Sequence, residues 1–210
     1  MKKRLVMLLM VSCFLISMVG CGGEVNLSLI NLAKQSLGTS LTETKDQSEE
    51  TREEIKDAYT QMKEYISEKN LADQNIIRLE SRLDSIKSKH KSLVRTVNKC
   101  KSDGSHLFKL LTRRANENKT ENLRNILKDK IRDKQEQFET QIVIAEDVCE
   151  KVAQSVQKYD DLVGYFQVNK GLDGVDEIIE EIDGAIQSGN ILNKRIDMFV
   201  KTGMSMIDEL

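Results

Sequence analysis

The 210-residue chain contains no proline and no tryptophan, and its aromatic side chains are limited to four tyrosines and five phenylalanines. A compact core in a protein of this size normally uses more aromatic residues. Long amphipathic helices need only a narrow apolar stripe, and they exclude proline because its ring clashes with the preceding turn. Charged residues make up 31% of the chain and hydrophobic residues 39%. The composition therefore predicts an all-α, elongated protein.

Residues with catalytic or metal-binding chemistry are also scarce. The only histidines are His90 and His106, which are far apart in the sequence. The chain has no Cys-x-x-Cys pair, no glycine-rich phosphate loop and no nucleophile elbow. Carboxylate pairs such as Glu180-Glu181 fall in helical segments and are interpreted as solvated faces. No catalytic residue, metal ligand or cofactor is assigned, and a non-enzymatic function is expected.

The first twenty residues have the pattern of an export signal. Three cations at positions 2–4 precede an almost wholly apolar run from Leu5 to Val19. A run of about fifteen residues suits a signal peptide, whereas a membrane-spanning helix needs about twenty. The run ends in Met18-Val19-Gly20-Cys21, which resembles the bacterial lipobox, where small residues precede a cysteine that accepts a diacylglycerol. The alternatives are a plain signal peptide cut nearby and an uncleaved anchor.

The resemblance to a lipobox implies that residues 1–20 are removed as a lipoprotein signal peptide and that Cys21 is lipidated. Acyl chains would hold the protein on a bilayer, since each buried methylene contributes about 0.8 kcal/mol. The second mature position holds Gly22 rather than Asp. In a Gram-negative host, the absence of Asp at this position resembles the default for sorting to the outer membrane. We therefore expect an exported protein that is lipid-anchored to the bacterial membrane, with its domain in the periplasm or on the cell surface.

Two regions are expected after the signal peptide. Residues 21–45 mix Gly, Ser, Thr and Asn with a short apolar patch at Leu27 to Leu32, and they are expected to form a flexible tether that contains at most one short helix. Residues 46–210 are expected to form a helical coiled-coil domain, with Ser48 as a plausible N-cap.

The clearest pattern is a run of apolar positions that alternates steps of three and four, as in a coiled-coil seam. Its members are Ile76, Leu79, Leu83, Ile86, His90, Leu93, Val97 and Cys100 and, with Gly104 skipped, Leu107 and Leu111. It predicts a helical arm over about 48–112, either as one helix or as two with a break at Asn70 to Asp73. His90 stands on this seam, where a polar residue more often fixes register than binds a metal.

A polar stretch from Thr112 to Thr120 predicts a turn. A second arm over about 120–168 follows, with apolar residues repeating at sevens: Ile131, Phe138, Ala145, Val152, Tyr159 and Phe166. Asn169-Lys170-Gly171 predicts a stop, with Gly171 as the C-cap. A last helix over about 172–202 is expected to be interrupted near Gly189.

The two arms predict an antiparallel coiled-coil hairpin with an additional C-terminal helix. With the apex of the hairpin near residue 116, the residue numbers of two positions that face each other across the arms add up to about 232. Phe138 would then lie opposite Leu93, Val152 opposite Leu79, and Cys149 opposite Leu83. Cys100 and Cys149 would be roughly 25 Å apart along the axis, which is too far for a disulfide. Both cysteines are interpreted as small core residues, with redox or intermolecular pairing as the alternative.

Charge is strongly segregated along the chain. Residues 87–134, here called the basic segment, carry fifteen Lys or Arg and five acids, which is about +10, and they surround the expected turn. The other residues of the helical domain are net acidic. The hairpin would therefore have a positive tip, which could reach about 100 Å from its acidic open end. The tip residues proposed to bind a polyanion are Arg113, Arg114, Lys119, Arg124, Lys128, Lys130 and Arg132.

A cationic tip predicts electrostatic capture of a polyanion such as an anionic lipid or a cell-wall polymer. The alternative is that these charges only solvate a helix surface. Nucleic acid is not expected as a partner, because export removes the protein from the cytoplasm. In addition, Phe108 is the only aromatic residue among the basic ones. A two-helix hairpin also leaves apolar surface, which the last helix or a second copy of the chain must cover.

From Arg78 to Phe199 the chain resembles a family of uncharacterised bacterial lipoproteins with long helical hairpins and no known activity. The resemblance depends on the heptad-like second arm, on Ala145-Glu146, and on Tyr159 to Leu172. It implies fold and location only. The expected function is that of a membrane-anchored spacer or scaffold of the cell envelope. The alternative is a surface-exposed binding module, such as an adhesin or ligand binder.

Overall fold

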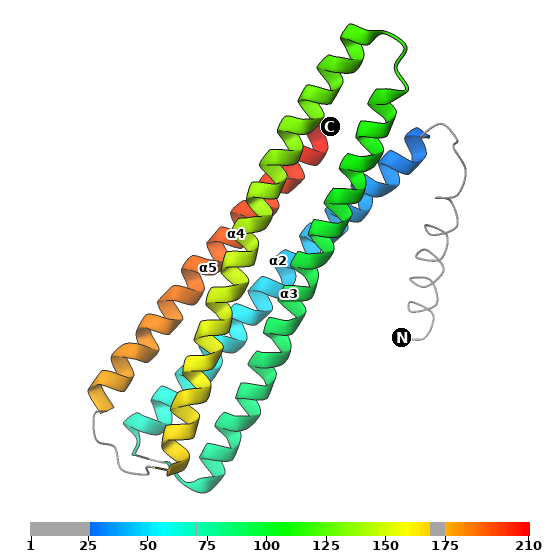
Figure 1. Ribbon diagram of the computed structural model, residues 1–210. Helices are drawn as coiled ribbons and strands as arrows, with labels where there is room; N and C mark the ends of the chain where they lie inside the picture. The colour runs from blue at the N-terminus through cyan, green and yellow to red at the C-terminus, as the bar shows by residue number, and fades with distance from the viewer. Residues whose placement is uncertain (1–25, 70, 169–174) are drawn as a thin grey trace, which may run out of the picture.

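The computed structural model describes residues 26–69, 71–168 and 175–210 as four long helices (Figure 1). They are α2 (Leu27–Ser67), α3 (Asp73–Asn116), α4 (Glu121–Val168) and α5 (Val175–Glu209). The described residues contain no strand, so the all-α prediction is confirmed. The signal peptide and Cys21 lie outside the described residues.

The helices form an up-down-up-down bundle, in which each helix runs antiparallel to the next. α2 packs against α3 and α5, and α4 packs against the same two helices. The α3–α4 hairpin predicted from the sequence is therefore one half of the bundle, and α2 and α5 form the other half. With 44 residues in α3 and 48 in α4, the rod is about 65–70 Å long at 1.5 Å per residue.

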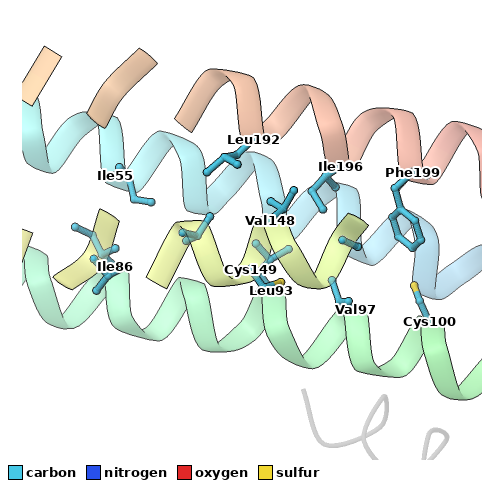
Figure 2. Close-up of a cluster of buried hydrophobic side chains, with 14 of the residues drawn as sticks. Ile55, Ile86, Leu93, Val97, Cys100, Val148, Cys149, Leu192, Ile196 and Phe199 are labelled. Atoms are coloured by element: carbon cyan, nitrogen blue, oxygen red, sulfur yellow. The ribbon is translucent and has the colours of Figure 1, made fainter. Parts of the chain in front are cut away.

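The core runs along the whole rod and draws on all four helices (Figure 2). The seam predicted on α3 is buried except at His90 and Leu111, which are half-buried. The residues of α4 that repeat at sevens, from Ile131 to Phe166, are buried throughout. Ile196 and Phe199 of α5 are fully buried, as are Leu37, Leu41 and Met62 of α2. The apolar surface of the α3–α4 hairpin is thus covered by the chain's own helices.

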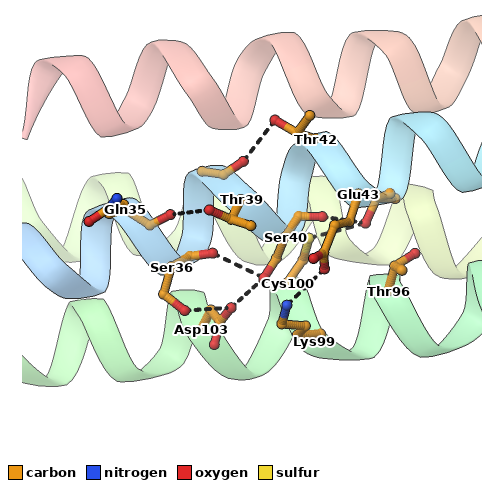
Figure 3. A network of polar contacts seen from close by, with 12 residues as sticks. Gln35, Ser36, Thr39, Ser40, Thr42, Glu43, Thr96, Lys99, Cys100 and Asp103 are labelled. Atoms are coloured by element: carbon orange, nitrogen blue, oxygen red, sulfur yellow. Dashed lines mark hydrogen bonds and ion pairs between the residues drawn. The ribbon is translucent and has the colours of Figure 1, made fainter. Parts of the chain in front are cut away.

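The expectation of a flexible tether over residues 21–45 is wrong from Leu27 onward, because α2 begins there. Its first turn is capped by Asn26, whose Oδ1 accepts a hydrogen bond from the Ser28 amide at 3.1 Å. The Ser and Thr hydroxyls that suggested a tether donate to the helix's own carbonyls four residues earlier, as Ser40 and Thr44 do at 3.1 and 2.8 Å (Figure 3). These satisfied hydroxyls can be buried without an unpaired polar group.

Other helix boundaries follow the sequence pattern more closely. The first arm is two helices, since α2 ends at Ser67 and α3 begins at Asp73; Lys69 between them has a left-handed φ of 53°. The second turn, from 117 to 120, falls inside the predicted stretch, and α4 ends at Val168 as expected. The predicted C-cap Gly171 lies outside the described residues. The predicted interruption near Gly189 is wrong, because α5 continues from Val175 to Glu209.

The predicted pairing of α3 with α4 is displaced. Phe138 packs against Phe108, with ring centroids 5.8 Å apart, rather than against Leu93. Tyr159, rather than Val152, lies opposite Leu79, because the Tyr159 hydroxyl donates a hydrogen bond of 3.3 Å to the Leu79 carbonyl. Facing positions therefore sum to about 240 rather than 232, because the turn is centred later than residue 116.

Two polar side chains fix this register. His90 Nε2 donates to the backbone carbonyl of Cys149 at 2.9 Å, so Cys149 lies opposite His90 and not opposite Leu83. On the diagonal of the bundle, Tyr59 of α2 donates to the Ser155 carbonyl of α4 at 2.8 Å. The Tyr59 ring also meets the Tyr159 ring edge-to-face at 5.2 Å.

Gly104 is required by the packing of α3 on α4. A Cβ atom at this position would lie 2.1 Å from Cε1 of Phe138, and the Phe138 side chain is itself only 3% exposed. The ring therefore lies directly on the backbone of α3 and has no space into which to move.

We predict that Gly104→Ala lowers the free energy of unfolding by roughly 1–3 kcal/mol because it overpacks the core. This loss should outweigh the 0.5–1 kcal/mol or so that alanine normally contributes to a helix. Gly189→Ala is the matched control, since no atom lies within 4 Å of its Cβ position, and it should stabilise the bundle. Urea unfolding followed by circular dichroism measures both. A Gly104→Ala protein as stable as the parent would contradict the packing.

Candidate functional site: the basic end of the bundle

The α3–α4 hairpin extends beyond the other two helices at one end of the rod (Figure 1). An ion pair between Lys134 of α4 and Glu209 places the end of α5 level with residue 134. The hydrogen bond from Ser36 to Asp103 at 3.1 Å places the start of α2, nine residues earlier, near residue 112 of α3. Residues 121–133 of α4 thus extend about 20 Å past α5. Residues 109–134 are called the tip below.

Most cations of the basic segment that lie outside the tip are neutralised within the bundle. Four lysines of α3 form ion pairs of 2.7–2.8 Å with acids of α2 or α4: Lys87 with Asp160, Lys89 with Glu50, Lys99 with Glu43, and Lys101 with Glu146. The hydrogen bond from Lys89 holds the pKa of Glu50 below its ordinary value. The acidic residues of the neighbouring helices therefore compensate this part of the segment.

The tip has a different balance of charge. It contains nine Lys or Arg and four acids, so its net charge is 9 − 4 = +5. Arg114 pairs with Glu117 at 3.0 Å and Arg132 with Asp129 at 3.0 Å, both within the tip itself. Arg113 is exposed at the end of α3.

The other four candidate residues of the tip have no salt bridge to a carboxylate of the described residues. They are Lys119, Arg124, Lys128 and Lys130. Arg124 is half-buried, while the three lysines are exposed. All seven residues predicted to bind a polyanion thus gather at one end of the rod, where Glu209 at the end of α5 interacts with one of them, Lys130.

Exposed apolar side chains lie at the same end, and the sequence pattern did not identify them. Leu123 is 45% exposed, and Ile126 and Leu27 are 63% exposed. They are uncovered because neither α2 nor α5 extends along the first three turns of α4. Leu123 and Ile126 are apolar but stand outside the seven-residue repeat that forms the buried face of α4. Their position outside the repeat could have identified them as exposed.

The chain enters the bundle beside the tip, because Leu27 lies at that end. Cys21 is six residues before Leu27, so the two can be at most about 21 Å apart. In the predicted hairpin the chain would enter at the acidic open end, about 100 Å from the tip; this is wrong, because α2 begins beside the tip. The additional helix α2 reverses the direction of the chain once more before α3 begins.

Polar side chains between α2 and α3 form a buried network that has a structural role (Figure 3). Ser36 and Ser40 both donate to Asp103 Oδ2, and Thr44 Oγ1 lies 3.3 Å from Cys100 Sγ. Burial raises the pKa of the Cys100 thiol to about 12 and that of the Cys149 thiol to about 11. Both cysteines are free and buried in the core, so neither has the depressed pKa of a reactive thiol.

Three further observations concern the described residues as a whole. They contain no cluster of three or more His, Cys, Asp or Glu able to hold a metal ion. None of the four helices combines the length and the apolar character needed to cross a membrane. Compared with protein-family models, curated proteins and solved structures, the chain has no match. Function must therefore be argued from the arrangement of charge and helices.

The burial of the two thiols predicts their reactivity. At pH 8 the native protein should react with a disulfide reagent such as DTNB many times more slowly than the urea-unfolded protein, because both pKa values are raised far above that pH. Cys149 should be modified before Cys100, since it is 7% exposed while Cys100 is fully buried. Mass spectrometry of quenched samples assigns the site. Rapid labelling of Cys100 in native conditions would contradict the buried α2–α3 interface.

Proposed function

We propose that the protein is a non-enzymatic lipoprotein of the bacterial cell envelope that acts as a membrane-anchored spacer or scaffold. Export would remove residues 1–20, and acyl chains on Cys21 would attach the chain to a membrane. The four-helix rod would then present its distal end, where α2 and α4 end and α3 and α5 begin, away from the lipid. The basic tip would contact an anionic component of the envelope.

The observation that carries this proposal is the short distance between Cys21 and the rigid rod. Only five residues separate Cys21 from Leu27, so the connection spans at most about 21 Å. The rod beyond it is about 65–70 Å long. An anchor so close to one end of a stiff bundle favours a defined spacing over free movement on a long tether.

A second candidate function is that of a binding module that uses the α4–α5 face. Val143, Ile191 and Met198 are each 60–63% exposed there. The Arg195–Asp147 ion pair of 2.6 Å places Val143 and Met198 at nearly the same level of the rod. A groove between the two helices lies nearby and is lined by Lys151, Lys158 and Arg195 among others. Exposed apolar residues rimmed by charge are typical of protein-binding surfaces.

The anchor is tested by expressing the full chain in a bacterial host that is fed labelled palmitate. The unaltered chain and Cys13→Ser should both carry the label and sediment with membranes, because Cys13 lies inside the expected signal peptide. Cys21→Ser should lose the label and leave the membrane fraction. Label that persists in Cys21→Ser, or an unaltered chain without label, would refute the proposed lipid anchor.

A further inference from the structure

We infer that the tip docks on the anionic headgroups of the same bilayer that holds the acylated Cys21, so that the rod stands on the membrane with its tip down. This inference rests on the proposed lipid anchor, because the anchor brings the bilayer to this end of the bundle. It assigns the tip a partner of one chemical class, the anionic phospholipid surface, and it gives the whole rod an orientation.

The first argument is geometric. The start of α2 lies near residue 112, and the turn at 117–120 projects about 8 Å further along the axis. A connection of at most about 21 Å between Cys21 and Leu27 cannot carry this end far from the surface to which Cys21 is attached. The tip therefore lies within about 21 Å of the headgroups. The electrostatic potential of the headgroups decays over roughly 8–10 Å at ordinary salt.

The second argument is the distribution of charge between the two ends of the rod. The tip has a net charge of +5, counted above. The distal segments, residues 57–80, 158–168 and 175–186, contain four bases and twelve acids, which is 4 − 12 = −8. A negatively charged surface attracts the tip and repels the distal end. The electrostatic field of the membrane thus favours a rod that stands with its tip on the surface over a rod that lies flat.

The third argument is the exposed apolar surface among these cations. Leu123 and Ile126 lie on α4 between Lys119 and Lys128, with Arg124 in the same two turns. Cationic side chains beside exposed Leu and Ile on one helix are typical of segments that lie in a membrane interface. Leu27, also exposed, is the first residue of the helix nearest to Cys21. A lipid surface is therefore a better fit than a wall polymer, which would satisfy the charges but not the apolar residues.

The diacylglycerol on Cys21 would supply two acyl chains, which are enough for stable attachment. A basic patch at the tip would therefore orient the rod rather than hold it on the membrane. Lys119, Arg124, Lys128 and Lys130 form no salt bridge with a carboxylate of the described residues, so they can supply that basic patch. Glu121 and Asp129, which stand among them in the sequence, and Glu209, whose pKa Lys130 helps to lower, reduce the net attraction without reversing it.

The test compares two exposed isoleucines at opposite ends of the rod. Ile126 in the tip is 63% exposed and Ile77 near the distal end is 61% exposed. In the full-length lipidated chain, a cysteine is introduced as Ile126→Cys or Ile77→Cys and is labelled with a thiol-reactive fluorophore. The label is specific for this cysteine, because the native thiols are buried and Cys21 is acylated. The protein is reconstituted into vesicles that contain nitroxide-labelled lipid, either with phosphatidylglycerol or with phosphatidylcholine alone. We expect strong quenching at position 126 in the anionic vesicles and none at position 77.

Charge variants separate the electrostatic contribution. Lys119, Arg124, Lys128 and Lys130 are all changed to Gln in the first variant. This change should weaken contact between the tip and the anionic bilayer roughly tenfold or more, given the usual contribution of each cation near such a surface. The matched control removes four exposed lysines from the shaft and the distal end, namely Lys56, Lys69, Lys158 and Lys194, and it should leave quenching at position 126 unchanged.

The outcomes distinguish this inference from the proposed anchor. Sedimentation of the labelled chain with vesicles reports the anchor alone. Sedimentation without quenching at position 126 would overturn the docked tip while leaving the anchor intact. Equal quenching at positions 77 and 126 would mean that the rod lies flat, which also overturns the inference. Quenching that is unaffected by lipid charge or by the tip variant would show that apolar contact alone holds the tip, and it would refute the electrostatic docking.

Discussion

The packing of α2 onto α3 is the contact on which the rest of the structure depends. It buries Ser40 and Thr44 completely, and their hydroxyls satisfy carbonyls of their own helix while Ser36 and Ser40 also donate to Asp103. Small side chains allow the two backbones to approach, and Gly203 of α5 meets Leu41 on another side of α2. Without α2, the α3–α4 hairpin would expose the apolar surface that α2 now covers, and α5 would lose one of its two neighbours.

The same contact determines where the charges are directed. Because α2 runs antiparallel to α3, its acids Glu43 and Glu50 lie beside the lysines of α3 and neutralise them. Because α2 begins near residue 112, no acid of α2 reaches the tip. The lengths of the helices thus leave Lys119, Arg124, Lys128 and Lys130 of the tip without a salt bridge to a carboxylate of the described residues. The direction of α2 also brings the chain's entry point, and with it Cys21, to this basic end. The proposal of a spacer that is anchored and oriented at one end rests on these two features together.

Composition and periodicity predicted the all-α class, the seam of α3, the buried repeat of α4 and the turn between them, because apolar spacing along a helix is a local property. They failed for the first half of α2, residues 27–47, where buried Ser and Thr interrupt the apolar pattern, because hydroxyls bonded within a helix leave no hydropathy signal. They also failed at Gly189, where a solvent-facing glycine weakens a helix without ending it. The register of the hairpin depended on the centre of one turn, and a small error there displaced every predicted partner. The seven basic residues do lie at the end of the hairpin, and their binding to a polyanion stays a prediction. Their position relative to Cys21 could not be predicted without knowing that α2 is a helix.

The most direct test of this account is the distance between the start of α2 and the end of α3. Spin labels at Ser28→Cys and Asn116→Cys, both exposed positions, can be measured by pulsed electron paramagnetic resonance without interference from the buried native thiols. The bundle predicts a Cα–Cα separation of about 12 Å, from an axial offset of about 8 Å and the usual 8–10 Å between neighbouring helices. If residues 27–45 were instead a tether at the open end of the hairpin, the two labels would be about 60 Å or more apart. That result would contradict the placement of Cys21 beside the basic tip.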